Sequence, residues 1–527
     1  MNNSPSQSAT ASVPSHPFQA QPWLLLSVPD SEFYDFCLQA HSLALREPEI
    51  LTRIEADLDS AAKEKKRLRL LDQQWVAGQT RDLPTVQFES QPLTAAELKL
   101  GEGRPRLSAF VVFIFLMIRG YSGGFKANAA RVLREESVTL TVFLANLGLH
   151  LPGSSTLNEH ANHVSNATRQ FILDAQIRQI LDEGWDDFNS LTIDSTAVAA
   201  NTGWPTDSQL LVDLARRFWQ RGSKLEAFGV ANLVDRAVPA ILAELASLNL
   251  RIQFSAGKPK SQGKRKRHYV RLLKHVEKLA GKFQTQWETV RRALNQVSLP
   301  PSQYARLARL VTWMSEDIAH LRQVAGYCRR RVMAGETVGS TEKVLSLSDP
   351  AAGYIAKGQR EPVIGYKPQL ARSREGFIPS VVIPLGNAAD VSQLSVVVAE
   401  CVRRVGHLPA EISVDDGYAS KAVRQQFLAD GVKVVSVSGS KGKKIISTDD
   451  WDSAAYVTAR RERSAVESLM STIKSGFDFG QVMRRGAEPV RAELLEKVLA
   501  YNCCRMVEKK RAFQHQGKPT GQALLAA

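Results

Sequence analysis

Residues 411–439, EISVDDGYASKAVRQQFLADGVKVVSVSG, contain the clearest structural signal in the chain. An apolar run ends at Asp415 and a turn follows at Gly417; a helical pattern then continues until Gly431, after which a second β-rich run begins. A strand, a helix and a strand in this order form a βαβ unit, whose two strands lie parallel. The stretch therefore predicts an α/β domain with a carboxylate at the end of a strand.

The elements on either side extend this unit into a larger domain. Residues 190–198, SLTIDSTAV, alternate as a strand that carries Asp194 on one face. Residues 361–386 contain two β-rich runs joined at 373–376 as a hairpin, and Asp390 and Gln393 form a D-x-x-Q cap for a helix that continues to about 404. A long helical insertion follows the first strand. Without it, the order of strands and helices is that of an RNase H-like domain with a mixed sheet. In that arrangement the first and fourth strands are neighbours.

Composition predicts how the rest of the 527-residue chain is organised. The longest apolar run, residues 109–118, is too short for a membrane span and predicts a buried helix. The turn at 152–156 lies between short helices, a pattern that fits a DNA-binding helix-turn-helix and a plain helical bundle equally well. The predicted parts are a disordered tail (1–21), a helical N-terminal region (22–185), the first piece of the RNase H-like domain (188–200), a basic helical insertion (201–345), the remainder of that domain (346–477) and a C-terminal helical segment (478–527).

The charge of the chain favours a polyanionic partner. Sixty-eight lysines and arginines against 53 acids give a net charge of +15. The five cysteines are few and odd in number, and they show no C-x-x-C spacing, so neither a disulfide framework nor a zinc ribbon is supported. Together with the lack of an apolar signal segment, this predicts a cytoplasmic protein without a membrane partner.

Three carboxylates are the candidate catalytic groups: Asp194, Asp415 and Glu467. Glu467 lies in RERSAVESLMSTIK (461–474), beside an apolar helical stripe, with Arg463 and Lys474 on the same face. Converging carboxylates raise one another's pKa unless cations compensate them. Two Mg²⁺ ions would provide that compensation and would serve phosphoryl displacement. The plainer alternative for Glu467 is a solvated ion pair with Arg463.

These residues resemble a known family, the DDE transposases of bacterial insertion sequences. DST (194–196), DDGY (415–418) and the spacing of Arg463, Glu467 and Lys474 are similar to its motifs, including Y-R-E-K, over about residues 190–510. WPTDS and VDDGYAS look closest to the ISNCY group. The resemblance selects Asp415 over Asp416 as the metal ligand, but Arg460 stands where the motif has tyrosine.

The resemblance implies a specific function. A transposase would bind the ends of its element, here with the helical region 22–185, and would cleave the DNA in the RNase H-like catalytic domain. It would then transfer a strand to target DNA, using two Mg²⁺ ions for which Mn²⁺ can substitute. Its partners would be double-stranded DNA and at least a second copy of the chain in the active complex, and the protein would be associated with the bacterial nucleoid. Two alternatives stay open: a transposase-derived DNA-binding protein without catalysis, and an RNase H-like nuclease that only hydrolyses.

One further stretch is a candidate for DNA contact. Lys264, Arg265, Lys266 and Arg267 follow glycines and a proline, which predicts a flexible basic loop that contacts phosphates. A targeting signal and a merely solvated loop are the alternatives.

Overall fold

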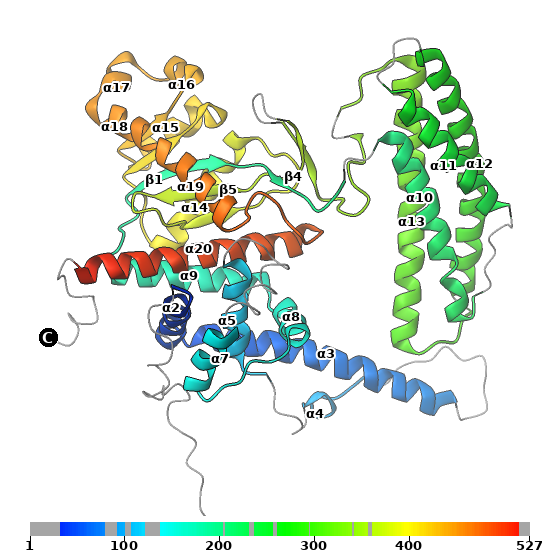
Figure 1. Cartoon of the computed structure of the whole chain (residues 1–527), viewed down its shortest axis with the longest axis horizontal. Coiled ribbons are helices and arrows are strands. Elements are labelled where there is room, and N and C mark those ends of the chain that lie inside the picture. Colours follow the sequence, from blue (N-terminus) through cyan, green and yellow to red (C-terminus); the bar gives the residue numbers. More distant parts are fainter. Residues whose placement is uncertain are drawn as a thin grey trace, which may run out of the picture.

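The computed structural model (Figure 1) combines a mixed sheet, a layer of N-terminal helices and a long helical bundle. It describes residues 32–79, 92–100, 107–121, 137–203, 206–230, 237–256, 261–294, 296–339, 342–356 and 361–515. The predicted tail at 1–21 lies outside these residues, as does the start of the possible helix-turn-helix. Within them, no helix is long and apolar enough to cross a membrane.

The main sheet has five strands in the order β6-β5-β1-β7-β8. The strand β1 is parallel to β7, and β7 is parallel to β8, whereas β5 is antiparallel to both β1 and β6. The first and fourth strands of this sheet are therefore neighbours, as the sequence predicts, and the topology is compatible with an α/β RNase H-like fold. The strands are β1 (Ser190–Ser195), β5 (Gln369–Ser373), β6 (Ser380–Val382), β7 (Glu411–Val414) and β8 (Val434–Val437).

The βαβ unit forms as predicted. Ser420 accepts a hydrogen bond from the backbone nitrogen of Val423 at the start of the helix α15 (Lys421–Ala429), and Gly431 follows its end with a φ of 106°. The other helices of this half are α14 (Asp390–Val405), α16 (Ser440–Ile445), α17 (Thr448–Asp452), α18 (Ala454–Glu462), α19 (Ser464–Gly476) and α20 (Ala487–His515).

A second, three-stranded sheet was not expected from the sequence. It contains β2 (Val198–Ala199), β4 (Val363–Tyr366) and β3 (Gly353–Ile355), in that order and all antiparallel. The β-rich run at the start of 361–386 therefore belongs to this small sheet. The hairpin joined at 373–376 connects β5 and β6, as predicted.

The insertion is a bundle with a core of its own (Figure 1). Its helices are α10 (Asp207–Gly222), the 3₁₀ turn Leu225–Phe228, α11 (Val238–Phe254), α12 (Gln262–Leu294) and α13 (Pro301–Arg329), followed by the π-helical turn Arg330–Ala334. The prediction of a basic loop is wrong, because residues 264–267 lie in the first turns of α12. The apolar stripe that begins at Tyr269 extends the helix backwards, and a glycine at position 263 costs little in a first turn.

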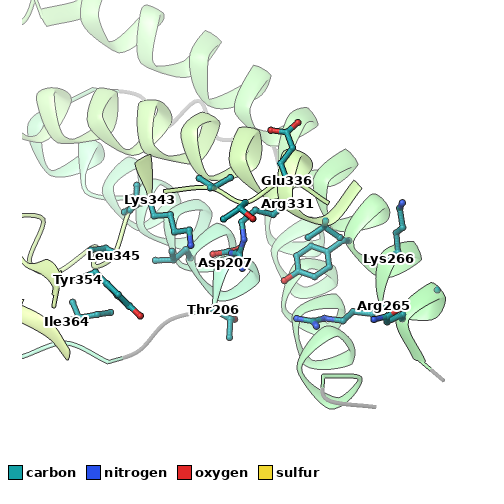
Figure 2. Close-up of a pocket in the computed structure, with 18 residues that line it drawn as sticks. Thr206, Asp207, Arg265, Lys266, Arg331, Glu336, Lys343, Leu345, Tyr354 and Ile364 are labelled. Atoms are coloured by element: carbon teal, nitrogen blue, oxygen red, sulfur yellow. The ribbon is translucent and has the colours of Figure 1, made fainter. Parts of the chain in front are cut away.

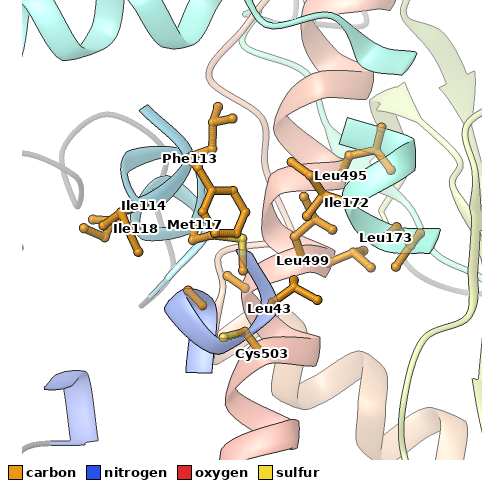
Figure 3. Packing of buried hydrophobic residues seen from close by; sticks show 14 of the residues in the cluster. Leu43, Phe113, Ile114, Met117, Ile118, Ile172, Leu173, Leu495, Leu499 and Cys503 are labelled. Carbon is orange, nitrogen blue, oxygen red and sulfur yellow. The ribbon is translucent and has the colours of Figure 1, made fainter. Parts of the chain in front are cut away.

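The N-terminal helices share their core with the C-terminal helix. The predicted buried helix is α5 (Ala109–Gly120), in which every residue is buried. Figure 3 shows Phe113 and Met117 of α5 beside Leu495 and Leu499 of α20. A Cβ on Gly120 would lie 2.0 Å from the carbonyl oxygen of Glu496, so only glycine permits this approach. The remaining helices are α2 (Glu32–Arg46), α3 (Glu49–Gln79), α4 (Ala95–Leu98), α7 (Ser137–Asn146), α8 (Ser154–His163) and α9 (Asn166–Asp182).

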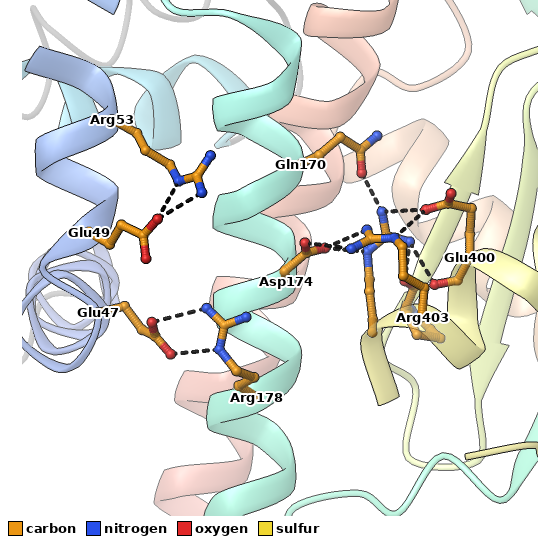
Figure 4. Close-up of polar contacts among 10 residues, drawn as sticks. Glu47, Glu49, Arg53, Gln170, Asp174, Arg178, Glu400 and Arg403 are labelled. Atoms are coloured by element: carbon orange, nitrogen blue, oxygen red, sulfur yellow. Dashed lines mark hydrogen bonds and ion pairs between the residues drawn. The ribbon is translucent and has the colours of Figure 1, made fainter. Parts of the chain in front are cut away.

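The helix α9 links this layer to the sheet (Figure 4). On one side of α9, Asp174 accepts from Arg403 at 2.9 Å and from Arg404 at 2.7 Å, both on α14. On the other side, Arg178 donates to Glu47 at 2.8 Å, in the turn between α2 and α3. Ion pairs on both sides of α9 therefore connect the N-terminal helices to α14.

Candidate active site

Asp194 and Asp415 lie at the carboxyl ends of adjacent parallel strands. Thr192 of β1 pairs with Ser413 of β7, and Asp194 and Asp415 each lie two residues further along the chain, toward the same edge of the sheet. The hydroxyl of Tyr418 lies near both carboxylates. Asp194 is 8% exposed, and Asp415, directly after β7, is half-buried. The structure brings these two carboxylates together although 221 positions separate them in the sequence.

Local hydrogen bonds orient both side chains. Oδ1 of Asp194 accepts from the backbone nitrogen of Ser195 at 2.6 Å. Oδ1 of Asp415 accepts from the backbone nitrogen of Gly417 at 2.8 Å, which fixes the tight turn of the DDGY segment. Each carboxylate is thus held by the backbone at the end of its strand.

Glu467 does not join this pair in the structure. Its side chain is 63% exposed and pairs with Arg463 at 2.9 Å. The apolar stripe forms as predicted, with Val466, Leu469 and Ile473 buried, and it leaves Glu467 at its edge. Among the described residues, no three His, Cys, Asp or Glu side chains form a group that could hold a metal ion. The conformation of Glu467 is that of the solvated ion pair.

Asp416 has a structural task. Its carboxylate accepts from the backbone nitrogens of Lys441 at 3.1 Å and Gly442 at 3.0 Å, in the first turn of α16. Burial acts to raise the pKa of Asp416, but these hydrogen bonds hold it below its usual value. Because Asp416 is committed to α16, Asp415 is the better candidate for a ligand.

The segment before Glu467 differs from the expected pattern in two ways. The continuous helical pattern is interrupted, because α18 ends at Glu462 and α19 begins at Ser464. Arg460, at the tyrosine position of the motif, lies 4.3 Å from the centre of the Trp451 ring. Glu462, the last residue of α18, is half-buried and pairs with Arg374 at 3.2 Å.

A buried ion pair beside the two aspartates was missed by the sequence reasoning. Lys367 and Asp390 are 2.8 Å apart and only 11% and 13% exposed. Gln369 donates to Asp390 at 2.9 Å and accepts from the hydroxyl of Tyr418. Asp390 was expected to cap a helix, but the N-cap of α14 is Ala389. Only the topology brings these residues together, so no local motif could have identified them.

Asp390 also approaches the DDGY turn directly. A Cβ on Gly417 would lie 2.9 Å from oxygens of both Asp390 and Asp415, so the two carboxylates converge on this glycine. Burial raises the pKa of Tyr418, and the nearby charges of Asp390, Asp194 and Asp415 raise it further. The site is therefore rich in negative charge, with Lys367 as a buried cation beside it.

The donor chemistry of the pair fits a hard divalent cation. Carboxylate oxygens are the ligands that Mg²⁺ prefers, and two carboxylates on neighbouring strands repel each other unless a cation lies between them. Asp194 and Asp415 have the oxygen atoms and the proximity for this task, and Glu467 would have to leave Arg463 to join them.

The basic run of α12 lies away from this site, in the insertion. Arg265 and Lys266 line a groove of about 1160 Å³ between the insertion and the small sheet (Figure 2). Lys264 and Arg267 do not line it and are exposed. The structure therefore divides the four predicted DNA-binding residues into two pairs.

The sheet and its two aligned aspartates define a class of protein, α/β domains with an RNase H-like arrangement and carboxylates at the ends of two parallel strands. Residues 339–503 match a known family, the transposase DDE domain. This match supports a DDE-type transposase, and hence a role in DNA transposition and recombination. No curated protein and no solved structure shows a significant match to the chain.

The matched range contains Asp415 and Glu467 but not Asp194. The insertion explains this boundary, because α10 to α13 separate β1 from the rest of the sheet in sequence. Asp194 thus enters the site through strand pairing and not through the matched segment.

Proposed function

We propose that this protein is a transposase that binds the ends of an insertion sequence, cleaves the DNA there and transfers a strand to target DNA. The observation that carries the proposal is the alignment of Asp194 with Asp415, which adds a first carboxylate to the matched domain. The ISNCY group and the Y-R-E-K signature remain part of this proposal, with Arg460 as the departure.

In this proposal Asp194, Asp415 and Glu467 hold two Mg²⁺ ions, for which Mn²⁺ can substitute. When bound, such ions activate a water or hydroxyl and stabilise the leaving oxygen of a phosphodiester. Asp194 and Asp415 supply the first two ligands, and Glu467 completes the set by leaving Arg463. The buried stripe of α19 stays packed while the side chain of Glu467 changes its partner.

The remaining contacts follow from the same proposal. Arg463, released from Glu467, and Lys474 bind phosphates beside the cleavage point, and the basic residues 264–267 bind DNA further away. The helical region 22–185 takes part in recognition of the element ends, and a homodimer or larger assembly holds two ends together. The protein acts in the cytoplasm, at the nucleoid.

The test uses a DNA duplex that carries the terminal repeats flanking the gene, incubated with protein and Mg²⁺. We expect cleaved ends and joined products from the wild type, and neither from Asp194→Asn or Asp415→Asn. Asp416→Asn is the matched control, since it also removes a charge from the DDGY turn but should keep substantial activity. Nicks without joined products would favour the hydrolytic nuclease instead, and binding without any cleavage would favour the inactive DNA-binding protein.

Glu467 has its own test because its observed pairing fits two roles. Glu467→Gln should abolish cleavage and joining while DNA binding stays nearly intact, since the amide keeps the shape but loses the charge that a metal ion requires. If Glu467→Gln cleaves at the wild-type rate, the carboxylate is only the solvated partner of Arg463.

A further inference from the structure

The groove between the insertion and the small sheet collects basic side chains from separate segments. Arg265 and Lys266 come from α12, Arg331 from the π-helical turn after α13, and Lys343 from the segment that leads to β3. Figure 2 shows Arg265 and Lys343 on opposite sides of the groove. Tyr354 of β3 and Ile364 of β4 belong to the wall formed by the small sheet.

The acidic residues of the groove are already neutralised. Asp207 pairs with Arg331, and Glu336 pairs at 2.7 Å with Arg330, which does not line the groove. The amine of Lys266 donates to the backbone carbonyl of Met333 at 3.0 Å. These contacts use up the negative side chains of the groove without reaching Arg265 or Lys343.

Among the cations of the groove, Arg265 and Lys343 have neither a carboxylate nor a hydrogen-bond acceptor of the described residues as a partner, whereas Lys266 has the carbonyl of Met333. Neither has a carboxylate of the described chain within ion-pair distance. The Nε of Arg265 is buried and has no hydrogen-bond partner among those residues, and its guanidinium lies 5.8 Å from the centre of the Tyr269 ring. A buried donor without an acceptor is costly, so a bound anion would stabilise this side chain.

The opposite face of α12 has a different character. Lys264, Arg267 and Arg271 lie on that face by helical spacing, together with His268. Burial lowers the pKa of His268, and the nearby charges of Arg251, Lys264, Arg271 and Arg267 lower it further. Lys264 and Arg267 therefore lie near His268 on the solvent side and do not line the groove.

We propose that the groove is a phosphodiester site in which Arg265 and Lys343 bind the DNA backbone and thereby fix the insertion against the small sheet. A phosphate offers several acceptors to a guanidinium and a charge to an amine, which is the chemistry these two residues lack. DNA is the source of the phosphate if the chain is a transposase, so this inference rests on the proposed function.

The structure offers a matched pair of variants for the test. Arg265→Gln/Lys343→Gln and Lys274→Gln/Lys278→Gln each remove two positive charges, the first from the groove and the second from the solvent face of α12, where Lys274 and Lys278 are exposed and do not line the groove. The affinity of the full chain for one fixed DNA duplex is measured over a range of salt concentrations. Because each phosphate contact contributes roughly 0.9 to the slope of log affinity against log salt, the groove variant should flatten the slope by about 2 and the solvent-face variant by far less.

The controls separate this inference from the proposed function. Unchanged thermal unfolding of both variants shows that the bundle is intact, and a random duplex should lose as much affinity as an end-bearing duplex. Equal slopes for the two variants would overturn the groove site, even if the wild type cleaves DNA. A slope difference in a protein that never cleaves would keep the groove site and refute the transposase.

Discussion

The N-terminal helices and the insertion are both helical, yet they relate to the catalytic sheet in different ways. The insertion encloses its own core between α10, α11, α12 and α13. The N-terminal helices have no separate core, because α2, α5 and α9 pack on α20 and share one apolar cluster with α19 and part of the sheet. Helical content alone therefore does not define a domain. A helical region is a domain when the residues that form its core all come from that region.

Both regions bury a carboxylate between two arginines, which makes the comparison closer. Glu496 of α20 pairs with Arg119 at 3.1 Å and with Arg169 at 2.6 Å, so it connects α20 to α5 and α9. Asp317 of α13 pairs with Arg217 and Arg221 of α10, inside the bundle. A buried carboxylate paired with two arginines thus connects the C-terminal helix to the N-terminal helices in one case, and two helices of the same bundle in the other.

The largest expected effect is on isolated fragments. A fragment of residues 201–345 should fold by itself, since its core is complete, whereas a fragment of residues 22–185 should not fold cooperatively without α20. Circular dichroism with urea unfolding compares the two, and addition of a peptide covering 487–515 is the control for the second. A sharp unfolding transition of 22–185 alone would contradict the shared core and would restore the expectation of a self-contained DNA-end-binding domain.

The next largest effect is the loss of stability expected when either buried carboxylate, Glu496 or Asp317, is replaced. Glu496→Gln leaves two buried guanidiniums without a charged partner and should destabilise the protein by about 3–5 kcal/mol. Asp317→Asn should cost a similar amount but only within the insertion, so the unfolding curve should split into two transitions. Denaturant unfolding monitored by circular dichroism measures both variants, and a single shifted transition for Asp317→Asn would show that the insertion does not unfold separately.

Much of this arrangement could be predicted from the sequence, and the failures have physical causes. The βαβ unit and the buried helix at 109–118 have local signals, namely turn residues and apolar periodicity. The burial of Lys367 and Asp390 has no local signal, because their contact depends on how β5 and α14 meet. The basic run was predicted as a loop because glycines and a proline precede it. The apolar stripe that begins at Tyr269 would have indicated a helix instead. For Glu467 the sequence leaves two conformations open, the ion pair with Arg463 and the approach to the aspartates, and the structure has the ion pair.

The contact between α9 and α14 should depend on pH. Burial acts to raise the pKa of Asp174, but Arg403 and Arg404 hold it below its usual value. A carboxyl group with a lowered folded-state pKa stabilises the protein above its unfolded pKa of about 3.9 and loses that contribution as pH falls through the folded value. Asp174→Asn should therefore be less stable than the wild type near neutral pH, and the difference should shrink as pH falls from about 3.9 through the lower folded-state pKa of Asp174. Urea unfolding of both proteins across this range tests the prediction, and a constant difference would contradict it.

The smallest effect concerns the hydrogen bonds that connect α3 of the N-terminal helices to α13 of the insertion. Asp72 of α3 accepts from the backbone nitrogen of Ser302 at 2.9 Å and from its hydroxyl at 2.6 Å, in the first turn of α13. Asp72→Ala removes this cap and should destabilise the insertion by about 0.5–2 kcal/mol without affecting the shared core. Hydrogen exchange of α13 measures the change, with the amides of α5 as the control. Equal loss of protection in α5 would mean that the two regions unfold together.

The packing of α5 against α20 also has a consequence for synthesis. The most apolar helix of the chain leaves the ribosome early, but the helix that covers it begins only at residue 487. At 5–20 residues per second, the gap corresponds to roughly 20–70 seconds during which α5 has no native partner from α20. We expect the insertion to fold within that interval, since its core is formed by its own residues. We therefore expect the nascent chain, and not the finished protein, to be the form that needs a chaperone, and we expect α5 to be the segment that the chaperone binds.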